Sequence, residues 1–363
     1  MHILVFGGGM QGLVIARNLV NRKEKPQVTV ADIRKPDSLP DGVTFKELNV
    51  LDGDKVKAAL NDVDTAVLAV PSQIAREALT NILKTGTACV DVCFTPEPPL
   101  DLADLAIAYG ACCFVDCGVA PGISHILAGR AYEELGGLDS IEIHVGGIPQ
   151  SPPAVFHHAV YFNPEDLISE YVRPARARTK GIDIEPDPLE AEIKPFHDRE
   201  MGELQSFISD GLRTLLTSFS DVPNMVERTL RREGHLKTMA DLKSLGLFEE
   251  DIVSGTARAL NNKFSSEDYP DFILMHVETR SKTGNKVKSW RMLDRATEEE
   301  SSMARTTGYT TAAVAMVLAR KEFTEPGVFP PEKLGKDADL TEIILKDLAD
   351  HGVVVVEELA AVK

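Results

Sequence analysis

Short apolar runs alternate with helical stripes over the first part of the chain. Six runs of apolar or β-branched residues predict strands, at residues 2–6, 28–31, 44–48, 66–70, 88–92 and 111–115. Between them, apolar residues recur at helical spacing, as in Leu13, Ala16, Leu19 and Val20 and again in Ile74, Ala78, Ile82 and Leu83. This alternation predicts a parallel sheet with right-handed crossovers and helices on both faces.

The pattern changes after Pro121. We predict strands at residues 140–145, 155–160, 271–280 and 287–293, the last two joined in a β-hairpin through Lys282-Thr283-Gly284-Asn285. Helices are predicted at residues 224–231, 236–245 and 303–320, followed by a last helix and a short strand near 340–356. The middle of the chain therefore reads as an α+β domain with an antiparallel sheet.

The predicted fold class is α/β, an N-terminal Rossmann sheet followed by an α+β domain. We expect a dinucleotide-binding Rossmann domain over residues 1–122 and an α+β substrate and dimerisation domain over residues 123–302. Residues 303–363 are expected to form C-terminal helices that pack back on the Rossmann domain. A homodimer is expected because the strands of the second domain would otherwise expose an edge.

A glycine-rich turn follows the first predicted strand. Gly7, Gly9 and Gly12 form the pattern G-x-G-x-x-G and open a helix. In this pattern the first glycine permits the tight turn, the second lets the backbone approach a pyrophosphate, and the third lets helix and strand pack closely. The N–H groups of Met10 and Gln11 lie at the helix N-terminus, where an anion is favoured. The segment therefore predicts a dinucleotide site.

Asp32 ends the second predicted strand, about 20 residues after the last glycine. Its carboxylate should accept hydrogen bonds from the ribose hydroxyls and repel a 2′-phosphate, which favours NAD over NADP. Arg34 leaves NADP open, because its side chain could pair with a 2′-phosphate or stack on adenine. We also expect cofactor contacts from Ile33, Asp52, Ala69 and Pro71.

The net charge and the cysteine pattern limit the kinds of partner and ligand that we expect. The net charge of the 363 residues is -17, which argues against nucleic acid or an anionic membrane as a partner. No apolar run of about 18 residues is present, and the N-terminus reads as a strand rather than a signal peptide, so a soluble cytoplasmic protein is expected. All five cysteines cluster between Cys89 and Cys117 without zinc-ribbon spacing, so we expect neither a metal site nor disulfides.

Several segments beyond the sixth predicted strand occur in a characteristic order. They are Asp116-Cys117-Gly118-Val119-Ala120-Pro121-Gly122-Ile123-Ser124-His125, Gly146-Gly147-Ile148-Pro149, Ser209-Asp210-Gly211-Leu212-Arg213-Thr214-Leu215, Glu227-Arg228-Thr229-Leu230-Arg231 with Gly234-His235, and Glu325-Pro326-Gly327-Val328 with Pro331-Glu332. In this order they resemble motifs of the saccharopine dehydrogenase-like family. The resemblance covers nearly the whole chain and implies a homodimeric enzyme with a Rossmann domain.

The compact length and the Thr229-Leu230-Arg231 segment look most like family members that oxidise the ε-amine of L-lysine. The resemblance therefore implies an NAD-dependent dehydrogenase that deaminates an amino-acid side-chain amine, giving 2-aminoadipate 6-semialdehyde from lysine. The chain departs from the family pattern at His158-Ala159, where relatives commonly carry Tyr-Lys, and at Arg232-Glu233, where Tyr-Pro is usual. Both departures fall in the predicted substrate domain.

Candidate catalytic and substrate-binding residues follow from strand ends and motifs. Ligands of open parallel sheets sit at the carboxyl ends of the strands, where Asp91, Cys93 and Asp116 lie, with Gly122 in the loop beyond. We expect Asp116 to bind the reacting amine, the alternative being that it caps the following turn. Arg231, with His235 beside it in the motif, is the candidate partner of a substrate carboxylate.

His158 is the candidate acid–base histidine. It follows His157 on a predicted strand, so only one of the two rings can face a cleft, and a satisfied structural histidine is the alternative for either.

Three functions are compatible with these features. The first is the amine dehydrogenase described above, and the second is an imine reductase of the saccharopine-reductase type. The third is a non-catalytic NAD-binding redox sensor, although the sequence lacks the helix-turn-helix or basic reader that a DNA-binding sensor needs.

Overall fold

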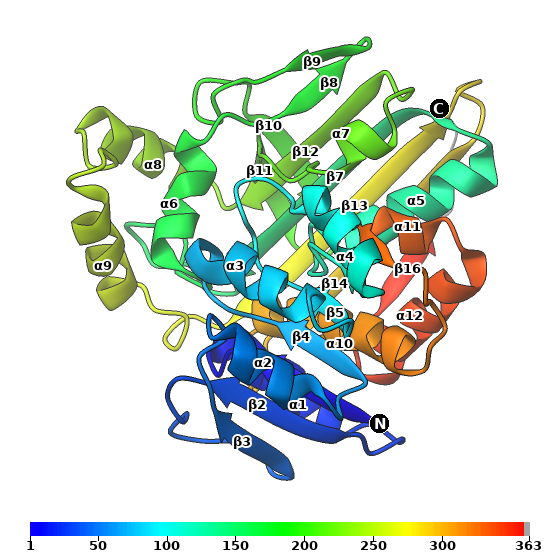
Figure 1. Cartoon of the computed structure of the whole chain (residues 1–363). Helices are drawn as coiled ribbons and strands as arrows, with labels where there is room; N and C mark the ends of the chain where they lie inside the picture. Colours follow the sequence, from blue (N-terminus) through cyan, green and yellow to red (C-terminus); the bar gives the residue numbers. More distant parts are fainter. Residues whose placement is uncertain (359–363) are drawn as a thin grey trace. The chain divides into compact units, whose positions relative to one another are not determined.

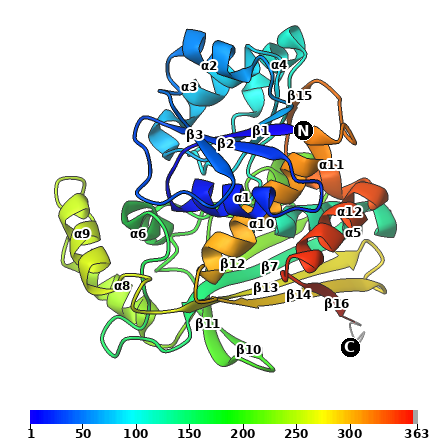
Figure 2. The same cartoon turned by 90° about the horizontal axis from the view of Figure 1, so that it is seen from below.

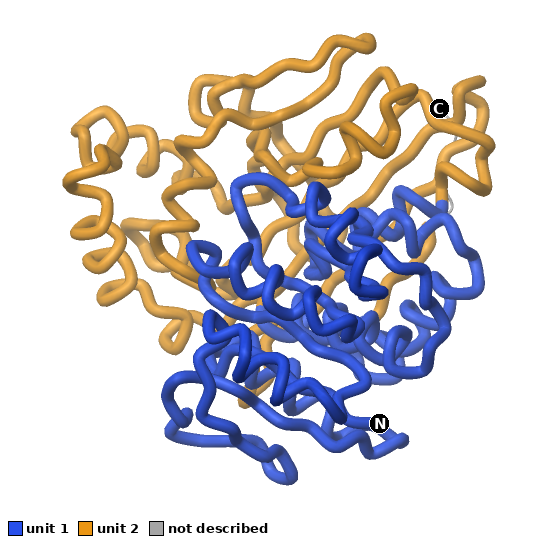
Figure 3. Tube along the Cα trace, viewed as in Figure 1, with its two compact units in different colours: residues 1–130, 304–353 blue, residues 131–303, 354–363 orange. Residues whose placement is uncertain are grey.

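A computed structural model describes residues 1–358 of the chain. It divides into two compact units (Figure 3): unit 1 comprises residues 1–130 and 304–353, and unit 2 comprises residues 131–303 and 354–363. The expected domain boundaries fell after residues 122 and 302, and they remain predictions. The contact-based division differs from them mainly at the end of the chain, where the strand Val355–Glu358 belongs to unit 2.

Unit 1 contains a seven-stranded sheet whose strand pairs are all parallel (Figure 1). Its strands are β1 (His2–Phe6), β2 (Gln27–Asp32), β3 (Val43–Glu47), β4 (Thr65–Leu68), β5 (Ala88–Asp91), β6 (Cys112–Phe114) and β15 (Gly327–Phe329). They run in the order β15-β6-β5-β4-β1-β2-β3. The order reverses between β1 and β4, which is where dinucleotides bind in open parallel sheets. The six strands predicted at the start of the chain are all confirmed to within two residues.

Helices cover both faces of this sheet (Figure 2). They are α1 (Met10–Val20), α2 (Gly53–Leu60), α3 (Ser72–Leu83), the 3-10 turn η1 (Leu100–Leu102), α4 (Ala103–Tyr109), α10 (Ser302–Ala319), α11 (Glu332–Gly335) and α12 (Ala338–Asp350), with α5 (Ile123–Leu135) beginning in the same unit. The central strands β1 and β4 are buried on both faces, which explains their continuous apolar sequences.

The C-terminal helices belong to unit 1, as the fold class predicted. A Cβ atom at Gly308 of α10 would lie 2.8–3.3 Å from the side chains of Gln11, Val14 and Ile15, so α10 packs tightly on α1. An ion pair between the buried Arg22 and Asp347 ties the end of α1 to α12.

Unit 2 contains a nine-stranded mixed sheet. Its strands are β7 (Leu138–Pro149), β8 (Ala177–Thr179), β9 (Ile182–Ile184), β10 (Lys194–Asp198), β11 (Gly202–Ile208), β12 (Asn224–Arg231), β13 (Asp271–Ser281), β14 (Val287–Arg295) and β16 (Val355–Glu358). Seven of them run in the order β10-β11-β12-β7-β13-β14-β16, and β8 and β9 branch from β12. The helices of this unit are α6 (Pro164–Val172), α7 (Leu215–Ser218), α8 (His235–Ser244) and α9 (Val253–Lys263).

Two predicted elements of unit 2 are wrong. Residues 224–231 form the strand β12 rather than a helix, and because β12 runs parallel to β7 the sheet is mixed rather than antiparallel. β12 lies between β11 and β7 with both faces largely buried, so the two-residue alternation that marks a strand is hidden in its sequence.

Residues 155–160 form a turn rather than a strand. The His157 N–H donates to the Pro153 carbonyl at 2.9 Å, and His157 has a positive φ of 57°. Phe156 is buried in the core from this turn, so its apolar character does not mark a strand.

No helix within residues 1–358 is long and apolar enough to cross a membrane.

The homodimer remains a prediction, and the exposed edges of unit 2 suggest where to test it. The sheet ends in β10 and β16, whose outer backbone groups could pair with a second copy, and Val354 and Val356 are exposed beside or on β16. We expect light scattering at micromolar concentration to give twice the mass of one chain. The mass of a single chain under those conditions would contradict this expectation.

Candidate functional site

The glycine turn between β1 and α1 has two positions without room for a side chain. A Cβ atom at Gly7, where φ is 110°, would lie 2.0 Å from the Ala69 carbonyl oxygen. At Gly12 it would lie 1.9 Å from the Gly7 carbonyl oxygen. Both glycines therefore permit the close packing of β1, α1 and the end of β4 that the motif predicts.

Gly9 differs from these two positions, because a Cβ atom there would meet no protein atom within 4 Å. Gly9 is the N-cap of α1, no side chain caps the helix, and its first turn contains no acidic residue. The N–H groups at this helix start, including those of Met10 and Gln11, favour an anion. The open space at Gly9 and the uncapped helix fit the pyrophosphate of a dinucleotide.

Asp32 connects the end of β2 to the glycine turn. Its Oδ2 accepts a hydrogen bond from the Gly8 N–H at 2.6 Å, and its Oδ1 accepts one from the Arg34 N–H at 3.1 Å. Ile33, beside it, is 61% exposed and offers an apolar surface next to the carboxylate. A carboxylate and an exposed apolar side chain at this position fit an adenosine half of the cofactor.

The other predicted cofactor residues have structural roles of their own. The Asp52 side chain accepts from the Lys55 N–H at 3.2 Å and caps α2. Pro71 is the N-cap of α3, and Ala69 supplies the carbonyl against which Gly7 packs. Their contacts with a cofactor remain predictions.

A second group of predicted residues lies at the carboxyl ends of β4, β5 and β6. The Cys93 N–H donates to Asp91 Oδ1 at 2.8 Å, and the Cys117 N–H donates to the Asp91 carbonyl at 3.1 Å. The Val70 N–H donates to Cys93 Sγ at 3.3 Å, which joins this group to the end of β4. Burial, and then the charge of Asp91, raises the pKa of the Cys93 thiol well above its usual range, so Cys93 is a neutral thiol.

Asp116 lies in the loop that follows β6. It is buried and has a positive φ of 56°, and Thr311 of α10 donates to the neighbouring Cys117 carbonyl at 2.8 Å. Gly122 closes the loop, since a Cβ atom there would lie 1.7 Å from the Gly118 carbonyl oxygen. The structure thus gives Gly122 a backbone role, and its predicted contact with substrate stays a prediction.

In unit 2 a chain of hydrogen bonds links the Arg231 and His235 of the predicted motif. Arg231 Nε donates to the Tyr171 hydroxyl at 2.8 Å, and this hydroxyl lies 2.8 Å from His235 Nε2. His235 Nδ1 lies 2.8 Å from the Phe156 carbonyl, which can only accept, so Nδ1 carries the hydrogen and Nε2 accepts from Tyr171. Burial, with the Arg231 charge next, lowers the pKa of His235 to about 3.

Arg231 already has partners for each of its nitrogens. Besides Tyr171, it donates through Nη1 to the Leu230 carbonyl at 3.0 Å and through Nη2 to Glu170 at 2.6 Å. A substrate carboxylate at Arg231 would therefore have to compete with Glu170 of α6.

His158 is 1% exposed, and its ring centroid lies 4.7 Å from that of His235. Its Nδ1 atom has no hydrogen-bond partner. Burial and the Arg231 charge lower the pKa of His158 well below its usual range, so the ring is neutral at physiological pH. This ring can accept or donate one hydrogen bond more than it does, but it is a weak base.

Sequence reasoning missed one buried carboxyl in this cluster. Glu227 is 4% exposed and lies on β12 with Thr229 and Arg231 on the same face. Because a helix was predicted over residues 224–231, these three polar residues were not expected to lie on one face.

The five cysteines are free and buried. Burial raises the pKa of Cys112 to about 12 and those of Cys113 and Cys117 well above the usual range. Within residues 1–358 no three His, Cys, Asp or Glu side chains are placed to hold a metal ion.

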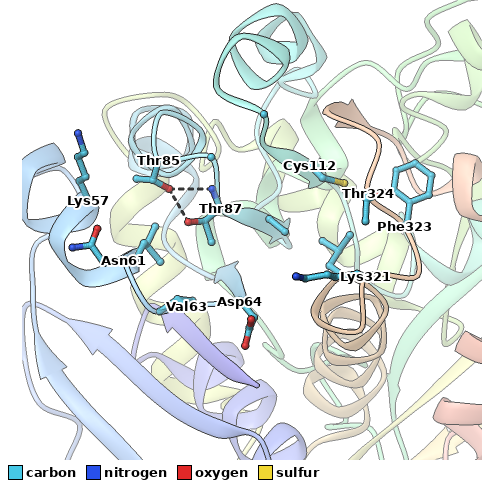
Figure 4. Close-up of a pocket in the computed structure, with 15 residues that line it drawn as sticks. Lys57, Asn61, Val63, Asp64, Thr85, Thr87, Cys112, Lys321, Phe323 and Thr324 are labelled. Atoms are coloured by element: carbon cyan, nitrogen blue, oxygen red, sulfur yellow. Dashed lines mark hydrogen bonds between the residues drawn. The ribbon is translucent and has the colours of Figure 1, made fainter.

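A cavity of about 470 Å³ in unit 1 lies at the opposite, amino-terminal ends of the strands (Figure 4). Asp64 before β4, Ala88 of β5 and Cys112 of β6 line it, together with Lys57 and Lys321. Because the glycine turn and Asp32 are at the carboxyl ends, this cavity is separate from the dinucleotide site.

A parallel sheet with a switch point, an anion-accepting glycine turn and a carboxylate at the end of β2 defines a dinucleotide-binding oxidoreductase. Comparison with known families agrees with this class. The family description "Saccharopine dehydrogenase NADP binding domain" matches residues 3–113, and "Saccharopine dehydrogenase C-terminal domain" matches residues 118–353. The chain therefore belongs to the saccharopine dehydrogenase family.

Individual relatives share only a low sequence identity with this chain. Saccharopine dehydrogenase (NADP+, L-glutamate-forming) of Schizosaccharomyces pombe is 26% identical over 156 residues, 40% of this chain and 34% of that protein, so the match spans about a third of the relative's length. Apo saccharopine dehydrogenase (L-Glu forming) from Saccharomyces cerevisiae shares the fold, with a TM-score of 0.81 and 17% identity over 99% of this chain and 100% of that one. The DAP dehydrogenase of C. glutamicum is less similar, with a TM-score of 0.50 and 14% identity over 97% of this chain and 99% of that one.

Gly9→Val tests the dinucleotide site. Since a Cβ atom at Gly9 meets no protein atom within 4 Å, the variant should fold, while its side chain would occupy the space of the pyrophosphate. Loss of charge-assisted hydrogen bonds should weaken NAD binding about 100-fold or more in calorimetric titration. Gly255→Val on α9 has equally open surroundings and is the matched control. Unchanged affinity in a folded Gly9→Val protein would remove the site.

The buried histidines predict a pH dependence of stability. His235 has a pKa of about 3 when folded and 6.5 as a free side chain, so below pH 6.5 the unfolded chain binds more protons and folding weakens. The loss should be about 2 kcal/mol at pH 5. Denaturant titrations at pH 7 and pH 5 should show a smaller difference for His235→Gln than for the native protein. The exposed His197→Gln is the control, and equal differences in all three proteins would contradict the assignment.

Proposed function

We propose that the protein is an NAD-dependent dehydrogenase that oxidises an amine on the side chain of an amino acid, with L-lysine as the substrate, which is the activity of a lysine 6-dehydrogenase. The observation that carries this proposal is the shared sheet edge of unit 1. The glycine turn and Asp32 lie there with two buried carboxyl residues, Asp91 and Asp116, at the ends of neighbouring strands. This arrangement supports a cationic amine bound beside a dinucleotide.

In the proposed reaction the carbon bearing the ε-amine loses a hydride and the amine nitrogen loses a proton, which leaves an imine. The bound dinucleotide supplies the hydride acceptor. Water then adds to the imine carbon, and ammonia leaves to give 2-aminoadipate 6-semialdehyde. We assign Asp116 to binding the reacting amine, supported by its buried position at the end of β6. His158, a neutral ring with an unpartnered Nδ1, is assigned to orienting water.

Arg231 is assigned to the substrate carboxylate, with Glu170 as its competitor in the ligand-free protein. The ion pair also makes Arg231→Ala a poor kinetic probe. Removing one partner of a buried pair costs about 3–5 kcal/mol of stability. Any rise in KM for this variant must therefore be measured together with its unfolding free energy.

NAD is the proposed cofactor. Asp32 supports it, because a 2′-phosphate would face the carboxylate that already binds the Gly8 N–H. The description of the matching family domain names NADP, so both cofactors belong in every assay.

The match to the Schizosaccharomyces pombe enzyme favours a second candidate, an imine reductase that joins an amino acid to a semialdehyde. The two candidates differ in the amine partner of the reverse reaction. A deaminating dehydrogenase uses ammonia, whereas a reductase of this second type uses glutamate.

A panel of free amino acids and polyamines, with NAD and with NADP, tests the proposal. We expect reduced dinucleotide to form with L-lysine and NAD, and the rate to rise with pH toward the pKa of the amine, because hydride leaves only from the neutral amine. Asp116→Asn should lower kcat by about 100-fold or more, a typical loss for a charged group at a reacting centre. Turnover with glutamate and a semialdehyde but not with lysine would replace the proposal by the second candidate.

A further inference from the structure

The two motifs singled out in unit 2 meet at Glu227. The Ser209 N–H donates to the Glu227 carbonyl at 3.1 Å, and the Thr229 hydroxyl donates to the Ser209 hydroxyl at 2.8 Å. Ser209 in turn hydrogen-bonds the Glu227 carboxyl. A polar row from β12 thus reaches the loop after β11 and holds the carboxyl in place.

Gly211 provides the space for this carboxyl. A Cβ atom at Gly211 would lie 1.7–2.1 Å from the two oxygens and the carbon of the Glu227 carboxyl group. Any side chain at this position would displace the carboxyl, so the glycine and the glutamate form one feature.

One oxygen of the Glu227 carboxyl group has no hydrogen-bond partner. Glu227 is 4% exposed, and its Oε2 has no hydrogen-bond partner. A buried acceptor without a donor is costly, and native proteins rarely retain one without a ligand or a function.

The two charged neighbours with the largest effect on Glu227 are acids. Glu170 of α6 and Asp210 of the loop after β11 both disfavour its ionised form, and the charge of Arg213 favours it. Arg231 is paired with Glu170, and Arg173 and Arg176 are paired with Asp210. Burial, followed by these two acids, raises the pKa of Glu227 to about 8.

A ligand at Oε2 must therefore supply a hydrogen-bond donor, and the negative charge of an ionised Glu227 favours a donor with positive charge. An ammonium group fits, because it carries one charge and three donors. We propose that Glu227 binds the non-reacting ammonium group of the amino-acid substrate and so selects α-amino acids over simple amines. The inference rests on the proposed function for the identity of the substrate, but the binding site itself does not depend on turnover.

Binding of the ammonium group requires an ionised Glu227. Near neutral pH the free protein holds a proton on this carboxyl, so ligand binding should release close to one proton to the buffer. The release should fall to about half a proton at pH 8 and become small well above that pH.

The experiment compares L-lysine with 6-aminohexanoate, which lacks only the α-ammonium group. Calorimetry with the NADH-saturated protein at pH 7, in two buffers of different ionisation enthalpy, gives both affinity and proton release. We expect the native protein to bind lysine about 10- to 100-fold more tightly and to release a proton with lysine alone. Glu227→Gln, neutral like the protonated carboxyl, should fold, bind both ligands equally and release no proton. Glu203→Gln on β11, with an exposed side chain, is the matched control and should behave as the native protein.

Two results separate this inference from the proposed function. Unchanged discrimination and proton release in Glu227→Gln would overturn the role of Glu227, whatever the enzyme oxidises. Absence of lysine turnover would overturn the proposed substrate only. In that case the same titration, with other α-amino acids and their counterparts lacking the α-amino group, still decides for or against Glu227.

Discussion

At Gly7 and Gly12 the turn between β1 and α1 has no space for a side chain, and the arrangement of unit 1 depends on these two positions. Gly12 packs with its Cα against the Gly7 carbonyl, and Gly7 packs against the end of β4. This contact fixes the start of α1 at the carboxyl edge of the sheet, where its N–H groups favour an anion. The Gly8 N–H donates a hydrogen bond to the Asp32 carboxylate, which holds this carboxylate at the same turn. Because all strands of the sheet are parallel, Asp91 and Asp116 follow strand ends at that same edge, and one packing constraint therefore gathers the groups that we propose to bind the cofactor and the amine.

Unit 2 shows how buried polar groups divide between structure and function. Arg231, Tyr171 and His235 form a directional chain in which each donor has an acceptor, and such a chain stabilises the fold around α6 and β12. Burial, together with the charge of Arg231, lowers the pKa values of His158 and His235 and keeps both imidazoles neutral. His158 and Glu227 lie beside this chain with one unmatched atom each. Since buried groups without a hydrogen-bond partner are costly, we propose a ligand contact for both of these residues.

Much of unit 1 was predictable from sequence, whereas unit 2 was less so, for a physical reason. In unit 1 the strands are short and apolar, the helices are amphipathic, and the glycine spacing dictates the turn, so local pattern and fold agree. In unit 2 β12 is buried on both faces and carries polar residues that pair inside the protein, so its sequence mimics a helix. The strand predicted around Phe156 was wrong for a similar reason, because this apolar residue is buried in the core without belonging to a strand. The roles of Arg231 and Glu227 depend on partners from other elements, Glu170 and Gly211, which no local pattern indicates.

The central claim is that hydride passes from the amine-bearing carbon of an amino acid to the dinucleotide bound at the glycine turn. It can be tested directly with L-lysine deuterated at the carbon that bears the ε-amine. We expect the reduced dinucleotide, isolated after turnover and analysed by mass spectrometry, to carry one deuterium per molecule, and reduction to be slower than with unlabelled lysine if the transfer limits the rate. Reduced dinucleotide without deuterium would contradict the account.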